Sequence, residues 1–444
     1  MNLLSLYATT PLGDLRHAVQ RTFLPSEKER QENSEVSTSV LLVDEMLDQL
    51  PADFFTRENA VLEPCCGKGN FLLALFTRFF HGLVKLVPDA EKRVDFIFTN
   101  CLYFADISGA NVALCTALLS AHAAAFVPGA KGPFKFHTYV GDTLKTNLLV
   151  HFGLRADRVT VVGNPPYTSD YSTASAKKST QPLYHKFIEL YLAAARLLFV
   201  VPSRWFLGGK GLSGFRAMML NRTDLRLICH REDPAAWFTT PVELKGGAHY
   251  FFKDAAYGGP CLFNGTPYRL NKYDSVVDPA YHAVIDQLAN RPGITSLYKG
   301  RFFKIETTDP RLKATGSPGA TVCYVSAVRA KNRINYIENF IFNSENTFWK
   351  VFTPKAAHEA HSGFGEIFIG NPDEIHSNSY LSFAVATQRE AVSLASYLKT
   401  DFANRMLAMR KISHNLCADT CKWIPLLPLD RLWDDAGVAV YLGI

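Results

Sequence analysis

Residues 158–167, RVTVVGNPPY, join an apolar run to two consecutive prolines. The run is short and bounded by turn residues, which is typical of a buried strand. The prolines end the strand because they have no backbone N–H groups, and they leave their carbonyl oxygens free to accept hydrogen bonds. The amide of Asn164 precedes them and the flat ring of Tyr167 follows. The stretch therefore predicts a strand end that presents acceptors and an aromatic face to a ligand.

Apolar runs and amphipathic segments alternate on both sides of this strand. Strands are predicted at AVLEP (60–64), LYFADIS (102–108), HTYVGDTL (137–144) and RLLFVVPSRW (196–205), and helices at 40–50, 71–80, 110–126 and 183–195. Two further runs, LRLICHRED (225–233) and GGAHYFFKD (246–254), have no helix between them and are predicted to pair as an antiparallel edge hairpin. This order predicts an α/β fold with a doubly wound, mostly parallel, seven-stranded sheet.

The alternation is lost after residue 265. We therefore predict a first domain over residues 1–265 and a second, mixed α+β domain over residues 266–444. Residues 291–355 hold eleven Lys and Arg against four Asp and Glu, together with ten aromatic residues. The segment TQREAVSLASYLKTDFANRMLAM (387–409) is predicted to form one helix.

The composition describes a packed globular protein. The net charge of +6 permits a polyanionic partner, and nine cysteines without paired spacings predict reduced thiols in a cytoplasmic protein. The N-terminus has no basic leader, so we expect no secretion. The run LYLAAARLLFVV is shorter than the ~20 residues of a membrane span, so we expect no membrane association. The His and Cys spacings predict no metal site.

A glycine turn, CCGKGN (65–70), follows the first predicted strand. Gly67 and Gly69 allow backbone to approach a ligand closely, but their spacing fits neither a phosphate-binding loop nor a dinucleotide fingerprint. Asp106 and Asp142 each end a later strand, and ligands of doubly wound sheets bind at that edge. One carboxylate is predicted to accept from ribose hydroxyls and the other from an exocyclic amine. The alternative is a pair of solvated loop carboxylates.

The NPPY stretch adds chemistry at the same edge. The Asn164 side chain and the Pro165 carbonyl are predicted to accept both hydrogens of an amino group. Such bonds push the nitrogen lone pair out of the ring plane, where it can attack an electrophile. An exocyclic amine on an aromatic base lacks this reactivity because its lone pair is delocalised.

These segments together resemble the S-adenosylmethionine-dependent amino-methyltransferases, in particular the adenine-N6 DNA methyltransferases of restriction–modification type. The resemblance covers most of residues 34–265. It implies a cofactor site formed by Thr38, Glu63, Gly67, Gly69, Phe71, Asp106, Ile107, Asp142 and Asn164. It implies a catalytic motif formed by Asn164, Pro165, Pro166 and Tyr167. It further implies that Tyr167 and Phe238 stack on an adenine flipped out of double-stranded DNA.

The chain departs from that family's pattern in one segment. Ser34, Ser37 and Ser39 stand where the family usually has Gly, Phe and Pro, which predicts a looser seat for the cofactor. With DNA as the substrate, the second domain is predicted to recognise the target sequence. The predicted phosphate or base contacts are Lys177, Lys178, Arg329, Lys331 and Arg333.

Several other functions share parts of this pattern. An RNA methyltransferase acting on an adenine or guanine amine faces the same chemical problem, and a catalytically weak relative would only bind nucleic acid. Methyltransferases of release-factor glutamine are shorter, and cytosine-N4 enzymes generally carry serine in place of Asn164. Too few residues precede the helix predicted at 40–50 for a nuclease domain. We therefore expect modification of DNA without self-contained cleavage, with any cognate restriction endonuclease a separate protein. Monomeric action is the default expectation for enzymes that read asymmetric or short sites.

Overall fold

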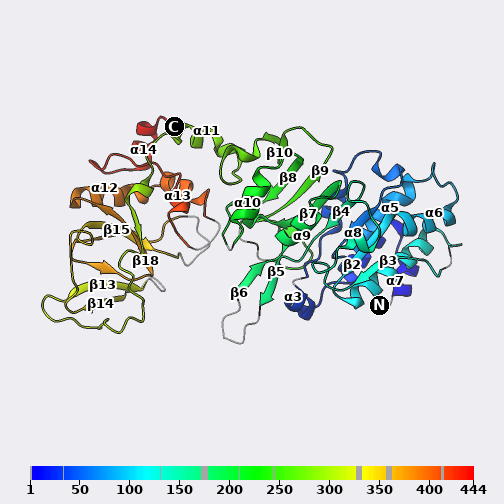
Figure 1. The fold of residues 1–444 in the computed structure, drawn as a ribbon, viewed down its shortest axis with the longest axis horizontal. Helices are drawn as coiled ribbons and strands as arrows, with labels where there is room; N and C mark the ends of the chain where they lie inside the picture. The colour runs from blue at the N-terminus through cyan, green and yellow to red at the C-terminus, as the bar shows by residue number, and fades with distance from the viewer. Residues whose placement is uncertain are drawn as a thin grey trace. The chain divides into compact units, whose positions relative to one another are not determined.

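Figure 1 shows the computed structural model, which describes residues 3–33, 35–130, 132–171, 179–209, 211–242, 244, 246–326, 333–356, 363–411 and 415–444. The chain forms two compact units, Met1–Val276 and Val277–Ile444. The domain boundary predicted after residue 265 falls inside a hairpin of the first unit, between Cys261–Phe263 and Thr266–Tyr268.

A nine-stranded sheet forms the centre of the first unit, in the order β11-β10-β8-β9-β7-β4-β1-β2-β3. Its strands are β1 (Val61–Glu63), β2 (Leu102–Asp106), β3 (His137–Val140), β4 (Thr160–Gly163), β7 (Arg196–Pro202), β8 (Leu225–Arg231), β9 (Ala248–Asp254), β10 (Cys261–Phe263) and β11 (Thr266–Tyr268). The five strands from β7 to β3 run parallel. β8 and β9 pair antiparallel as predicted, but β9 lies between β7 and β8, and β10–β11 extend the sheet beyond β8.

Both faces of this sheet are covered. Successive residues of a strand point alternately into two hydrophobic cores, one on each face of the sheet. Leu198 and Val200 of β7 face the first core, whereas Leu197, Phe199 and Val201 face the second. The first core also receives buried side chains of α1 (Leu3–Thr9), α2 (Leu15–Thr22), α4 (Val40–Leu47), α5 (Asn70–Gly82) and α7 (Gly109–Phe126). The second receives those of α8 (Leu148–His151), α9 (Tyr184–Tyr191) and α10 (Ser213–Leu220).

Three helices precede the predicted helix at 40–50: α1, α2 and α3 (Glu27–Asn33). The sequence analysis did not predict them. α6 (Ala90–Phe96) and a short hairpin, β5 (Thr168–Tyr171) with β6 (Ser179–Pro182), complete the unit. Among the described helices, α7 alone has the length and apolar composition of a membrane span. Its contacts with α1, α5, β2 and β3 make it a core helix.

The second unit is a mixed α+β structure. A four-stranded antiparallel sheet has the order β12-β18-β15-β16, and a three-stranded sheet has the order β14-β13-β17. Their bounds are β12 (Tyr298–Gly300), β13 (Thr321–Ser326), β14 (Arg333–Ile337), β15 (Trp349–Pro354), β16 (Phe368–Gly370), β17 (Ile375–His376) and β18 (Tyr380–Val385). The helices are α11 (His282–Leu288), α12 (Gln388–Leu398), α13 (Asp401–Ala408) and α14 (Asp435–Leu442).

The single helix predicted over residues 387–409 was wrong. The structure divides it into α12 and α13, because the Thr400 side chain accepts a hydrogen bond from Ala403 N and starts a new helix. Thr387 begins α12 with a capping box that includes Glu390.

Candidate active site

A cavity of about 290 Å³ opens at the carboxyl ends of β1, β2, β3 and β4, where the sequence predicted a ligand. Its walls come from the segment before α4, from the loops that follow these four strands, and from the start of α9. The lining residues are Glu35, Val36, Ser37, Thr38, Glu63, Cys65, Cys66, Gly67, Lys68, Asn70, Phe71, Asp106, Ile107, Asp142, Thr143, Leu144, Asn164, Pro165, Pro166, Thr168, Leu183 and Phe187.

The glycine loop is held by the carboxylate that ends β2. Asp106 accepts hydrogen bonds from Gly67 N at 2.9 Å, Ser108 N at 2.8 Å and Asn111 Nδ2 at 3.3 Å. Asp106 is 7% exposed, and burial raises the pKa of its carboxyl group while these N–H groups oppose the shift. Much of the acceptor capacity predicted for a ribose is therefore used to shape the loop.

The two glycines of the loop have different surroundings. Gly67 has φ +47°, and an added Cβ would lie 3.3 Å from Glu35 Oε1 in the cavity wall. Gly69 has φ +81° and starts α5, and its Cβ would lie 3.1 Å from Cys115 Sγ. Gly69 is absent from the cavity lining, although the resemblance implied that it binds cofactor. Glycine is required at position 69 because the backbone packs closely against Cys115.

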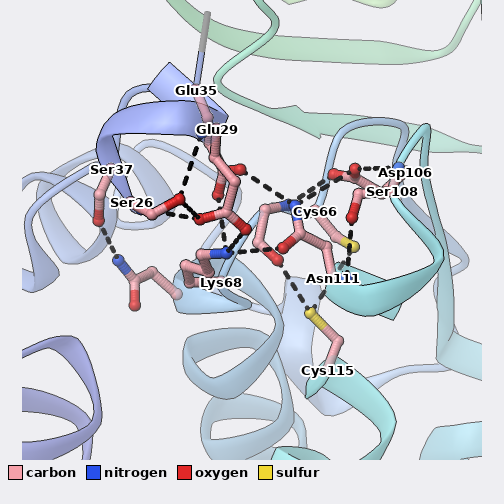
Figure 2. Close-up of polar contacts among 12 residues, drawn as sticks. Ser26, Glu29, Glu35, Ser37, Cys66, Lys68, Asp106, Ser108, Asn111 and Cys115 are labelled. Carbon is pink, nitrogen blue, oxygen red and sulfur yellow. Dashed lines mark hydrogen bonds and ion pairs between the residues drawn. The ribbon is translucent and has the colours of Figure 1, made fainter. Parts of the chain in front are cut away.

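Lys68, between these glycines, joins the loop to α3 and α7 (Figure 2). Its Nζ donates to Glu29 Oε1 at 2.6 Å and to Asn111 Oδ1 at 2.8 Å, and lies 3.7 Å from Glu35 Oε1. The Lys68 side chain is only 10% exposed. Burial is the largest single influence on the pKa of Glu29 and raises it, but the hydrogen bonds from Lys68 and Ser26 and the ion pair together lower this pKa to about 2.

Two carboxylates that line the cavity are incompletely paired. Glu35 Oε2 accepts from Asn111 Nδ2 at 3.1 Å, whereas Glu35 Oε1 has no hydrogen-bond partner among the described residues. Glu63 is 2% exposed, and its Oε2 likewise lacks a partner in the part of the chain that the structure describes. Burial raises the pKa of both carboxyl groups, and the neighbouring Asp106 adds to the effect. Unpaired buried oxygens of this kind fit a ligand that donates hydrogen bonds.

Asn164 follows the end of β4 and contacts the segment that carries Glu35. Its Nδ2 donates to Val36 O at 3.0 Å and to Thr38 Oγ1 at 3.1 Å. These two acceptors fix the orientation of the amide and leave Oδ1 buried with no protein partner among the described residues. Thr38, which the resemblance implied as a cofactor contact, thus positions the Asn164 acceptor.

Tyr167 and Phe238 lie next to each other but do not form an open slot. Their ring centroids are 6.2 Å apart and their planes meet at 76°, edge to face. Both are buried, at 5% and 7% exposure, and neither lines the cavity. Burial raises the pKa of the Tyr167 hydroxyl, with the Asn164 amide opposing the shift. A base held between parallel faces requires these rings to move.

The other predicted residues line the cavity at different depths. Pro165 and Pro166 belong to its wall and Phe71 is 2% exposed, whereas Ile107 is 59% exposed at its rim. Asp142 accepts from Leu144 N at 3.1 Å and pairs with the exposed Lys145 at 3.2 Å. Asp142 keeps acceptor capacity for a ligand at the end of β3.

The serines that depart from the family pattern have structural roles here. Ser39 caps α4 by accepting from Leu42 N at 3.2 Å, and Ser37 Oγ accepts from Asn70 Nδ2 at 3.3 Å. These bonds hold the segment at the cavity in place of the expected Phe and Pro side chains. Ser34 lies outside the described residues.

The predicted nucleic-acid contacts fall largely outside the structural description. Lys177, Lys178, Arg329 and Lys331 lie outside the described residues, and Arg333 is described only as the first backbone position of β14. These five contacts stay predictions.

Some site residues were missed by the sequence analysis. The tertiary roles of Glu29, Lys68 and Asn111 were not predicted, nor were the wall positions of Leu183 and Phe187. Lys68 gave one sequence signal. A lysine between two glycines of a partly buried turn is unfavourable unless acidic side chains lie close to its ammonium group. Asn111 gave no signal in a helix that reads as apolar and alanine-rich.

One part of the first unit matches a known family. Residues 159–238 are similar to the Eco57I restriction-modification methylase family. These 80 of 444 residues include Asn164, Tyr167 and Phe238. The matched region therefore contains the end of β4 and the residues that follow it. A search of curated protein sequences finds no match to the chain.

Solved structures with low identity are similar to this chain, and those of MmeI and LlaBIII have a TM-score above 0.5. The type IIL restriction-modification enzyme MmeI, solved in complex with DNA, has 12% identity and a TM-score of 0.54 over 93% of this chain and 70% of its own. The type ISP enzyme LlaBIII, bound to DNA, has 9% identity and a TM-score of 0.54 over 96% of this chain and 40% of its own. The type IIG restriction endonuclease BpuSI has 14% identity and a TM-score of 0.44 over 94% and 61%.

The present chain thus spans between 40% and 70% of the length of these three proteins. The likeness to MmeI and LlaBIII, together with the sheet of the first unit and the mixed second unit, confirms the predicted fold class.

Proposed function

We propose that the chain transfers a methyl group from S-adenosylmethionine to the N6 amine of adenine in a specific double-stranded DNA sequence. One observation carries the proposal. Asn164 belongs to the cavity wall, and Val36 and Thr38 orient its amide so that the buried Oδ1 has no partner among the described residues. A buried acceptor in that state fits an N–H donor of the substrate.

The chemistry follows from the acceptor. An exocyclic amine that donates to Asn164 Oδ1 and to the Pro165 carbonyl gains electron density on nitrogen, because its lone pair becomes less delocalised into the ring. Both acceptors follow β4 directly in the chain, so one turn would position both of them on the amine. A neutral acceptor suffices, since the reaction needs no general base of unusual strength before the methyl group is transferred.

The cavity fits the proposed cofactor. It carries four carboxylates, Glu35, Glu63, Asp106 and Asp142, and one cation, Lys68, which is already paired with Glu29. Such a cavity favours a ligand with net positive charge. S-adenosylmethionine supplies, when bound, an electrophilic methyl group on a cationic sulfur. Asp142 and Asp106 would hold its adenosyl portion, and the glycine loop its amino-acid portion.

The choice of DNA and adenine rests on similarity. The segment around Asn164 resembles restriction-modification methylases, and MmeI and LlaBIII, whose structures contain DNA, share the fold. The second unit would then read the target sequence, and base flipping would bring adenine to Asn164 while Tyr167 and Phe238 separate to stack on it. A cognate restriction endonuclease would be a separate partner.

The test is nucleoside mass spectrometry of unmethylated DNA incubated with S-adenosylmethionine and either the wild-type protein or Asn164→Ala. N6-methyladenine from the wild type alone supports the proposal. If RNA is methylated and DNA is not, the substrate is RNA and not DNA. If N4-methylcytosine forms, the target base is cytosine and not adenine. If calorimetry detects no cofactor binding and no product forms, the protein is a nucleic-acid-binding relative instead of an enzyme.

A further inference from the structure

One arginine beside the NPPY motif has no counter-charge. Arg204 belongs to the short helical turn Ser203–Phe206 that follows β7, and β7 pairs in parallel with β4, so Arg204 lies at the same edge of the sheet as Asn164. Its side chain is partly exposed, and among the described residues it forms no ion pair and its buried Nε has no hydrogen-bond partner. Arg196, at the start of β7, pairs by contrast with Asp254. A guanidinium in the state of Arg204 fits an anionic ligand.

The backbone that carries Arg204 is fixed by a buried histidine of β9. Ser203 and Trp205, on either side of Arg204, are both fully buried. Trp205 Nε1 can only donate and reaches His249 Nε2 at 3.1 Å, so His249 carries its proton on Nδ1, which lies 3.2 Å from Ser203 Oγ. Burial lowers the pKa of His249 and keeps the ring neutral. The position of the Arg204 backbone is therefore set before any ligand binds.

A short chain of contacts links Arg204 to the NPPY motif. The Tyr167 carbonyl accepts a hydrogen bond from Leu183 N at 2.9 Å, and Leu183 lines the cavity. Tyr184, the next residue, begins α9 and lies near Arg204. Burial raises the pKa of the Tyr184 hydroxyl, and the positive charge of Arg204 opposes this rise. Arg204 is thus a neighbour of the residues that form the target site, although it does not line the cavity itself.

The order of the strands indicates which ligand an anion at Arg204 would belong to. β4 separates β7 from the strands that carry the proposed cofactor contacts, in the order β7-β4-β1-β2-β3. Asp106 and Asp142 follow β2 and β3, whereas Arg204 follows β7. A ligand that extends from Asn164 to Arg204 therefore leads away from the proposed cofactor and belongs to the substrate.

The loop after Arg204 leaves room for a large group. Gly208 and Gly209 have φ values of +78° and +85°, and Gly209 is exposed. A Cβ added at Gly209 would meet no atom within 4 Å. Because this part of the loop has no side chains, the backbone of a nucleic-acid strand can pass close to it.

We propose that Arg204 binds a phosphate of the DNA strand that carries the target adenine, next to the flipped nucleotide. The inference rests on the proposed function. A flipped nucleotide rotates about its own backbone, so its phosphates stay outside the site while the base enters it. A guanidinium can donate two parallel N–H bonds to a phosphate, which is the anionic group of every nucleotide. Arg204 holds the strand beside Asn164 in this way without touching the reacting amine.

Transfer of tritiated methyl groups to unmethylated plasmid DNA tests this with the wild type, Arg204→Gln, Arg204→Lys and Arg158→Gln. Arg158 is exposed and lies just before β4, at the opposite edge of the sheet, so its variant removes the same charge away from the site. We expect Arg204→Gln to raise KM for DNA about 10-fold and to leave kcat within about 3-fold, because one phosphate contact is lost. The plot of log(kcat/KM) against log[KCl] should become shallower by about 0.9.

Two matched variants and one further measurement complete the test. Arg204→Lys should restore the wild-type salt slope because it keeps the charge, and Arg158→Gln should match the wild type in KM and slope. The affinity for S-adenosylhomocysteine, measured by calorimetry, should stay within about 2-fold in every variant. This last result also shows that the variants fold.

The outcomes separate the inference from the function on which it rests. If Arg204→Gln keeps the wild-type KM and salt slope, or if Arg158→Gln raises KM equally, Arg204 makes no local phosphate contact and the inference is overturned. If Arg204→Gln loses S-adenosylhomocysteine and Arg204→Lys does not restore the slope, Arg204 only supports the fold and the inference is again overturned. If the wild type transfers no methyl group to DNA, the proposed function itself fails and the inference fails with it.

Discussion

Two walls of the same cavity differ in how their polar groups are paired. On the wall after β2, Asp106 accepts three N–H groups of the protein, and these bonds shape the glycine loop. On the wall formed by Asn164 and Glu35, each side chain uses one end to anchor itself and leaves one oxygen unpartnered among the described residues. The paired wall maintains geometry, and the unpaired wall is available for chemistry.

The largest expected effect tests the unpaired wall. Asn164→Ala should lower the methylation rate about 100- to 1,000-fold, because one oriented acceptor for the reacting amine is lost. Its melting temperature should fall only modestly, because Oδ1 has no partner to lose among the described residues and the loss is limited to the two Nδ2 bonds to Val36 O and Thr38 Oγ1. Single-turnover kinetics and thermal unfolding measure the two quantities. A large loss of stability with unchanged methylation would reverse the roles of the two walls.

A second substitution tests the paired wall. Asp106→Asn should lower the free energy of unfolding by about 1–3 kcal/mol, because an amide NH₂ would face N–H donors that now meet a carboxylate. Asp142→Asn is the matched control, since Asp142 accepts from a single backbone N–H and is more exposed. Urea unfolding of both variants measures the difference. Equal losses would show that the Asp106 bonds contribute little to the loop.

The loop itself offers a smaller effect. Gly69→Ala should destabilise the protein by roughly 1–3 kcal/mol, through a left-handed φ and a Cβ placed 3.1 Å from Cys115 Sγ. Gly209→Ala has a similar φ of +85° with no atom within 4 Å, so it isolates the backbone cost. The excess loss in Gly69→Ala, measured by thermal unfolding, reports the packing of the loop on α7. No excess would show that Cys115 moves aside.

The smallest effect concerns the ion pair behind the loop. Burial raises the pKa of Glu29, but Lys68 and Ser26 together lower it from 4.5 to about 2, so the stabilisation is complete above about pH 4.5 and is lost as the pH falls toward 2. Glu29→Gln should therefore cost about 1 kcal/mol at neutral pH, and the difference from the wild type should shrink across that window. Asp53→Asn, in an exposed pair with Arg57, is the control. Unfolding measured against pH checks the slope, and a constant difference would refute it.

Much of the first unit could be predicted because its chemistry sits at strand ends. β1, β2, β3, β4 and β7 are apolar runs closed by turn residues, and each predicted run became a strand of the sheet. Because helices alternate with these strands, the strands are predicted to be parallel and their carboxyl ends to lie at one edge of the sheet. Asp106, Asp142 and Asn164 could therefore be placed at that edge from the sequence.

The rest depends on contacts between distant residues. Asn164 is oriented by Val36, 128 residues earlier, and Lys68 is held by Glu29 across 39 residues. α3, with the sequence EKERQEN, has no apolar stripe to reveal it. The edge-to-face packing of Tyr167 and Phe238 also follows from the tertiary structure, because composition alone predicts only that both are aromatic.

The segment that orients Asn164 has a consequence for biosynthesis. Thr38 bridges to Phe238, Ser39 N donates to Trp237 O at 2.9 Å, and Thr239 N donates to Ser37 O at 3.0 Å. The segment that supports the Asn164 amide is thus clamped by residues synthesised some 200 positions later. A nascent chain on the ribosome acquires this clamp only after residue 239 has emerged, so the Asn164 amide cannot be fixed in this orientation while only the first half of the unit has been synthesised.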